Sequence, residues 1–132
     1  MPVDRLGDFV ERMATILQAH DVDAINVSVR HSPATPEPLM TWARQEVFSF
    51  VLYYWQHTIE ADREKVGIWT RELIEAALAL GGTWYLPYQL HASREQFARG
   101  YPEAPRLLAL KARVDPANRL RNTLWDKYTP VH

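Results

Sequence analysis

Side chains suited to binding a small polar molecule lie at alternate positions near the start of the chain. Asn26, Ser28 and Arg30 alternate with apolar residues, which is the period of a β-strand with one polar and one buried face. Because side chains two positions apart on a strand point the same way, Ser28 and Arg30 can approach one ligand. The guanidinium fork of Arg30 suits an oxygen-rich or anionic group. The alternative is a solvated sheet face without a ligand, which the spacing alone favours.

A second group of candidates follows Pro87, which interrupts a segment of high strand propensity. Side chains at such an interruption leave the regular pleat and can be directed at a site. Tyr88 or His91 could act there in proton transfer, with Gln89 contacting the substrate. Alternatively, these side chains satisfy buried backbone groups at the end of a strand.

Tyr54 is a further candidate because it lies in an aromatic run. The side chains of Tyr53, Tyr54 and Trp55 alternate between the two faces of a strand. At least one of them is expected in the core, and one could line a pocket. We take Tyr54 as the substrate-binding candidate.

Several classes of function have no support in the sequence. The five histidines lack the paired spacing of a metal site, and no motif of a phosphate-binding loop occurs among only five glycines. A net charge of -1 gives no broad positive field for nucleic acid. The absence of cysteine fits a reducing compartment. With no readable signal peptide and no continuous apolar run for a membrane span, we expect a cytoplasmic protein.

Hydrophobic periodicity predicts the elements that position these residues, in the order helix, strand, strand, helix, strand, helices. They cover residues 4–20, 25–30, 46–55, 58–80 and 83–90, followed by short helices at 93–99 and 107–114. Gly81-Gly82 is a C-cap signal for the second long helix. Ser93 and Gln96 have the spacing of a capping box.

This order of elements is the βαββαβ ferredoxin-like plan without its first strand. The predicted class is therefore α+β: an antiparallel sheet with helices on one face, plus C-terminal helices, in a single domain spanning 1–132. In the full plan the first strand is central, so its absence leaves two unpaired sheet edges. We expect either a fragment of a larger protein or an obligate partner, such as a second copy in a homodimer.

Three motifs in the last third of the chain resemble a known family. They are Gly81-Gly-Thr-Trp-Tyr-Leu-Pro-Tyr-Gln-Leu-His-Ala-Ser-Arg-Glu-Gln-Phe97, then Tyr101-Pro102, then Leu110-Lys-Ala-Arg-Val-Asp-Pro116 with Arg119-Leu-Arg-Asn122. In this order they are similar to the end of FAD-linked oxidases of the vanillyl-alcohol-oxidase type, in the branch of sugar-lactone and alditol oxidases. Residues 25–31 and 46–55 also resemble the paired strands of that family's cap domain.

The resemblance implies that this chain is the C-terminal substrate or cap region of a flavoenzyme. An FAD-binding domain or subunit, upstream and absent here, would then carry the cofactor. The family chemistry is hydride transfer from a substrate carbon to flavin N5. Asn122 matches the family's terminal asparagine, so Asn122 and Arg121 become the candidates for cofactor contact.

The substrate-binding positions match the family unevenly. Arg30 matches a family arginine, whereas Ser28 stands where the carbohydrate-oxidising branch has a carboxylate. A polar pair of the alditol-oxidising members falls on Leu52 and Tyr54, and a lysine near the flavin falls on Tyr88. These replacements favour a larger or more apolar alcohol as the substrate.

A different class of protein fits the same pattern of elements. A stand-alone ferredoxin-like module could dimerise through its open sheet and bind a small ligand between the subunits.

Overall fold

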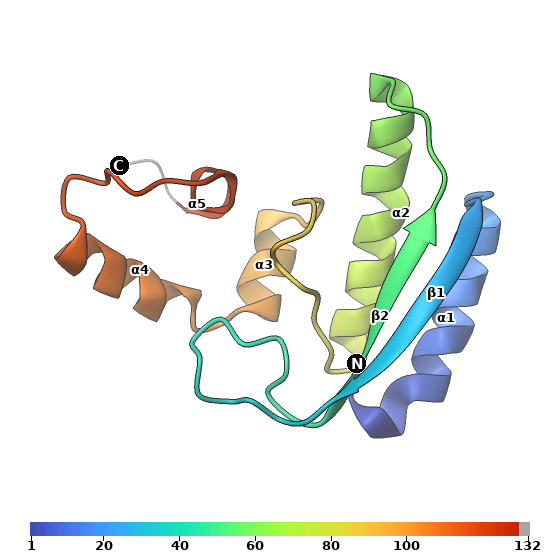
Figure 1. The fold of residues 1–132 in the computed structure, drawn as a ribbon, viewed down its shortest axis with the longest axis horizontal. Coiled ribbons are helices and arrows are strands. Elements are labelled where there is room, and N and C mark those ends of the chain that lie inside the picture. The colour runs from blue at the N-terminus through green and yellow to red at the C-terminus, as the bar shows by residue number, and fades with distance from the viewer. Residues whose placement is uncertain (130–132) are drawn as a thin grey trace.

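The computed structural model describes residues 1–129, in which a β-hairpin is backed by two helices and followed by a helical C-terminal half (Figure 1). The predicted domain spans 1–132, and its last three residues, which include His132, lie outside the described residues. The elements are a 3₁₀ turn at Val3–Arg5, α1 (Leu6–Ala19), β1 (Ala24–Ser32), β2 (Val47–Tyr54), α2 (Glu60–Ala79), α3 (Arg94–Gly100), α4 (Ala104–Val114) and α5 (Thr123–Tyr128).

Strands β1 and β2 form a two-stranded antiparallel sheet. Ser28 lies opposite Val51, and Arg30 lies opposite Ser49. Directly opposed residues of an antiparallel pair place their side chains on the same face of the sheet. Ser28, Arg30, Ser49 and Val51 therefore share one face, and Val29 and Phe50 share the other. A β-bulge between Ala24 and Asn26 shifts the register at the start of β1.

Helices α1 and α2 pack against each other, and an aromatic side chain of each contacts one face of the hairpin. The rings of Phe9 on α1 and Phe50 on β2 lie 5.0 Å apart, as do those of Trp69 on α2 and Tyr54 on β2. This core also contains Met1, Met13, Ile16, Ala76, Ala77 and Leu80. Because Phe50 and Tyr54 point to the helices, the set of side chains that includes Ser28 and Arg30 lies on the uncovered face.

The first two residues of the chain extend the sheet beyond β2. Pro2 forms an antiparallel bridge with Val47. The Met1 amine donates to the Phe48 carbonyl at 2.8 Å, and the Phe48 N–H donates to the Met1 carbonyl at 2.8 Å. Further along this outer edge of β2, no residue of 1–129 pairs with the backbone of Phe50 or Leu52.

A second core joins α2 to the C-terminal helices. Tyr101 is fully buried, and the rings of Phe97 on α3 and Tyr128 on α5 stack 4.2 Å apart. Ile74, Ala92 and Ala104 complete the buried part of this cluster. The predicted caps are confirmed, because Gly81 has a φ of 74° after α2, and Ser93 and Gln96 form the capping box of α3.

The predicted third strand is wrong. Residues 83–90 form no strand and turn at Leu86 and Pro87 instead. A strand needs a neighbour to pair with its backbone, and in the ferredoxin-like plan that neighbour is the missing first strand. Trp84, Leu86 and Leu90 pack against the second core. The α+β class is confirmed, with two strands and five α-helices among the described residues.

The C-terminal tail differs from expectation in one element. Helix α5 is not among the predicted elements, and its Leu124 and Trp125 are partly buried, whereas Leu120 ahead of it is 74% exposed. No helix within residues 1–129 is both long enough and apolar enough to cross a membrane.

Gly100 and Gly7 offer a matched test of the second core. A Cβ at Gly100 would collide with the Trp84 ring, whereas a Cβ at Gly7 on α1 would meet nothing within 4 Å. We expect Gly100→Ala to lower the free energy of unfolding by about 1–3 kcal/mol through overpacking. Gly7→Ala should raise it by up to about 1 kcal/mol, because alanine favours the helix. Urea unfolding followed by circular dichroism measures both, and equal stability of the two variants would contradict this packing.

Candidate functional site

Ser28 and Arg30 lie together on the uncovered face of the hairpin. The Arg30 Nε donates to the Ser28 Oγ at 3.4 Å, and the Ser49 hydroxyl donates to the Arg30 carbonyl at 3.3 Å. Arg30 forms no ion pair with any residue of 1–129. Its guanidinium is therefore available to bind an oxygen-rich or anionic group from outside the chain.

Tyr54 lies on the opposite face from these two residues. Its ring packs edge-to-face on Trp69, and burial raises the pKa of its hydroxyl. Tyr53 instead faces the same side as Ser28 and Arg30, with 48% of its surface exposed. The nearly continuous apolar run of β2 gave no alternation that could distinguish Tyr53 from Tyr54.

Tyr88 and Gln89 lie on the exposed turn that replaces the predicted third strand. Tyr88 is 61% exposed, and its ring meets the edge of Tyr85 with the centroids 5.4 Å apart. Tyr85 in turn contacts Trp42, with 6.0 Å between the centroids. The Gln89 carbonyl accepts a hydrogen bond from the His91 N–H at 3.0 Å.

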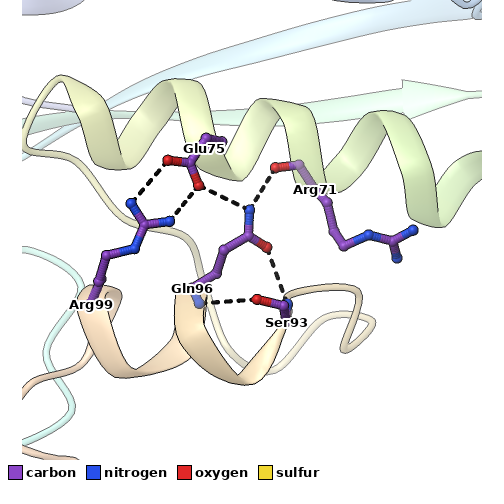
Figure 2. Close-up of polar contacts among 5 residues, drawn as sticks. All are labelled: Arg71, Glu75, Ser93, Gln96 and Arg99. Atoms are coloured by element: carbon purple, nitrogen blue, oxygen red, sulfur yellow. Dashed lines mark hydrogen bonds and ion pairs between the residues drawn. The ribbon is translucent and has the colours of Figure 1, made fainter.

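A polar network fixes helix α3 against α2, and with it the segment that carries His91 (Figure 2). The Gln96 Nε2 donates to the Arg71 carbonyl at 2.9 Å and to a Glu75 carboxylate oxygen at 3.3 Å. Arg99 donates to both oxygens of the same carboxylate. The hydrogen bond from Arg99, followed by that from Gln96, lowers the pKa of Glu75.

His91 packs against α2 where Gly67 leaves room for its ring. A Cβ at Gly67 would lie 3.5 Å from the His91 Nδ1. The His91 Nε2 is buried and has no hydrogen-bond partner in the described structure. Burial, and then the positive charges of Lys127 and Arg71, lower the pKa of the His91 ring. The imidazole is therefore neutral near pH 7 and can accept a proton.

An open groove of about 630 Å³ lies beside His91. Its walls come from α2 and from His91 itself, and they include Glu60, Glu64 and Arg71. Neither Arg30 nor Tyr88 lines this groove. The structure thus brings Ser28 and Arg30 together but places Tyr54, the turn at Tyr88 and the His91 groove elsewhere.

The C-terminal motif residues form hydrogen bonds that organise the chain after α4. The Asp115 carboxylate accepts from the Lys111 Nζ at 2.7 Å and from the N–H groups of Arg119 and Leu120 at 2.9 Å. Lys111 also donates to the Asn118 side chain at 2.9 Å. These contacts, with Lys111 contributing most, lower the pKa of Asp115 to about 2. The motif therefore has a folding role in this chain.

Asn122 and Arg121, the candidates for cofactor contact, both have partners within the chain. The Asn122 Oδ1 accepts from the Trp125 N–H at 2.9 Å and so caps α5. The Nε and Nη2 atoms of Arg121 donate to the Asp126 carboxylate at 2.9 and 2.7 Å. The Asn122 amide nitrogen keeps its donors for another group.

Within residues 1–129, no three histidine or acidic side chains are grouped so as to hold a metal ion.

Comparison with known proteins identified no relative: no family model, no characterised protein and no solved structure matches this chain. The resemblance to FAD-linked oxidases rests on the sequence motifs and stays a prediction.

The low pKa of Asp115 predicts how stability depends on pH. A carboxyl whose pKa is about 2 in the folded chain, against 3.8 as the ordinary value, stabilises the fold above pH 4. This contribution is lost as the pH falls through 2. Asp115→Asn should therefore flatten the decline in unfolding free energy between pH 4 and pH 2, measured by urea titration at each pH. Asp4→Asn is the control, and an equal effect in both variants would contradict the assignment.

Proposed function

We propose that this chain is the cap portion of an FAD-dependent oxidoreductase that oxidises an alcohol or a carbohydrate-like substrate. The motifs of the C-terminal third support the proposal, because their order resembles that of the FAD-linked oxidases. The observation that carries it is the pair Ser28 and Arg30, in contact on a sheet face that no other part of the described chain covers. Such a face suits a lid over a ligand held by another domain.

The uncovered face has the chemistry expected of a surface over a planar ring and a small substrate. Tyr53 and Val51 supply apolar surface, while Arg30 and Ser28 supply hydrogen bonds to a substrate oxygen. When bound, FAD would accept a hydride from the substrate carbon at N5. The chain encodes no glycine-rich phosphate loop, so an FAD-binding domain or subunit outside this chain would hold the pyrophosphate. The Asn122 amide nitrogen and Arg121 are the proposed contacts from this chain.

Oxidation of an alcohol to a carbonyl also releases the hydroxyl proton, which needs an acceptor. The proposed acceptor is His91, whose lowered pKa keeps the ring neutral. The exposed Tyr88 hydroxyl would act as a relay, passing its own proton to solvent as it takes up the proton of the substrate. Gln89, beside them on the same turn, is a proposed substrate contact. Because Arg30 and Tyr88 are not in contact within the chain, these two groups would act together only if the flavin domain lies across both.

The absence of cysteine supports a cytoplasmic location for such an enzyme.

A second candidate function is a stand-alone module that binds a small ligand between two copies of this chain. The unpaired backbone of Phe50 and Leu52 at the outer edge of β2 favours it, because an open edge is a ready site for a second strand. In this function Arg30 would bind an anionic ligand without a redox cofactor.

The proposal is tested by joining this chain to the flavin-binding region encoded upstream of, or next to, its reading frame. We expect the chain to shift the visible absorption spectrum of the bound flavin. Anaerobic addition of benzyl alcohol should then bleach the flavin faster than sorbitol does, since the aromatic residues favour an apolar alcohol. Arg30→Ala should slow this bleaching about 10- to 100-fold, because a charge-assisted hydrogen bond contributes about 1.5–3 kcal/mol.

Arg12→Ala is the matched control, because Arg12 is an exposed cation on α1, away from both the uncovered sheet face and the His91 groove. It should leave the rate of flavin bleaching unchanged. An unaltered flavin spectrum on mixing, or equal rates for the two variants, would rule out the cap assignment. Saturable binding of a small anion without flavin would support the second candidate instead.

A further inference from the structure

We propose that the His91 end of the groove along α2 binds a doubly charged oxyanion, the phosphate group of a small phosphate ester. The groove is the one of about 630 Å³ whose walls come from α2 and His91. This binding needs no flavin, so it stands independently of the proposed flavin chemistry. It rests on the positions of Arg71, Lys127 and His91 and on the partners of the carboxylates around them.

Two cations meet at the segment that carries His91. The Lys127 Nζ donates to the Leu90 carbonyl, and the Arg71 Nη1 donates to the His91 carbonyl at 3.5 Å. Burial, and then the charges of Lys127 and Arg71, lower the pKa of the His91 ring. Burial, and then the charge of Arg71, also lower the pKa of Lys127. The three basic groups therefore disfavour one another's charge, and a bound anion would relieve this repulsion.

The carboxylates nearest to these two cations in the sequence are bound elsewhere. Glu72 pairs with His20, Glu75 with Arg99, and Asp126 with Arg121. Figure 2 shows the Arg71 guanidinium directed away from Glu75 and its partners. Neither Arg71 nor Lys127 forms an ion pair with a residue of 1–129. Their positive charges are thus available to an anion from outside the described chain.

The acidic residues of the groove lie toward its other end. Glu64 precedes Arg71 by about two helical turns, or about 10 Å along the axis, and Glu60 precedes it by about three turns. Arg63, which also lines the groove, is next to Glu64 in the chain. An anion is therefore favoured at the end beside His91 and disfavoured at the end beside Glu60.

Gly67 leaves room for an oxyanion between Arg71 and His91. A Cβ at Gly67 would lie 3.1 Å from the Arg71 Nη1 and 3.5 Å from the His91 Nδ1, so both nitrogens approach one point on the helix surface. Two positive charges match a phosphate dianion better than a single carboxylate. The volume of the groove is in the range of small-molecule sites, which leaves space for the rest of an ester.

The bound anion would favour the protonated imidazole, whose Nδ1–H then becomes a further donor. A protonated His91 cannot accept a proton from a substrate. An occupied site would therefore suppress the role of proton acceptor proposed for this residue.

Titration with inorganic phosphate, followed through the histidine ring signals by NMR, tests the site on this chain without flavin. We expect a saturable shift of the His91 signals but not of those of His31, which lies on β1. Arg71→Gln should weaken phosphate binding at least about tenfold, because it removes a charge-assisted hydrogen bond. Lys127→Gln should weaken it less, since Lys127 does not line the groove. Arg12→Gln, which removes an exposed cation of α1, is the matched control and should leave binding unchanged.

Sulfate and acetate test the charge and the protonation that the site requires. Sulfate stays doubly charged between about pH 5 and pH 8, and it should bind about tenfold more tightly at the lower pH, where His91 gains a proton. In His91→Gln the affinity for sulfate should not change with pH over this range.

Three results would overturn the proposal, and none of them affects the test with the flavin spectrum. The first is the absence of a saturable shift of the His91 signals. The second is equal affinity for phosphate in Arg71→Gln and Arg12→Gln, with circular dichroism showing that both variants are folded. The third is equal affinity for acetate and phosphate, which would assign the site to a single carboxylate, such as an acidic side chain of another domain.

Discussion

The arrangement of this chain depends on the packing of β2 against two helices. The Phe50–Phe9 and Tyr54–Trp69 contacts decide which side of the hairpin is buried. Since strand side chains alternate, this choice leaves Ser28, Arg30 and Tyr53 on the uncovered side. The proposed ligand-binding surface follows from that one choice of face.

Elements with local signals were predictable from the sequence, and the element that depends on a distant partner was not. The two long helices have apolar residues at helical spacing, and Gly81 and the capping box of Ser93 mark ends that a few residues determine. Residues 83–90 have strand propensity, but a strand also needs a neighbour with free backbone groups. Pro87 and the missing first strand leave that segment to turn and pack its apolar side chains against the second core.

The candidate site was predictable only where one strand determines the geometry. Ser28 and Arg30 lie two residues apart, so their proximity follows from the strand period alone. The position of His91 depends on how the Glu75 network fixes α3 against α2, which involves residues about 20 positions away. The motif from Lys111 to Asn122 likewise has partners within the chain, so its presence is explained by folding whether or not a flavin is bound.

The position of Met1 has a practical consequence for work with this protein. Met1 is only 7% exposed, and its backbone runs antiparallel to β2. Any peptide fused ahead of Met1 would emerge opposite Ser49 and continue along the strand past Phe50. An affinity tag at this end would therefore lie against the same backbone groups of β2.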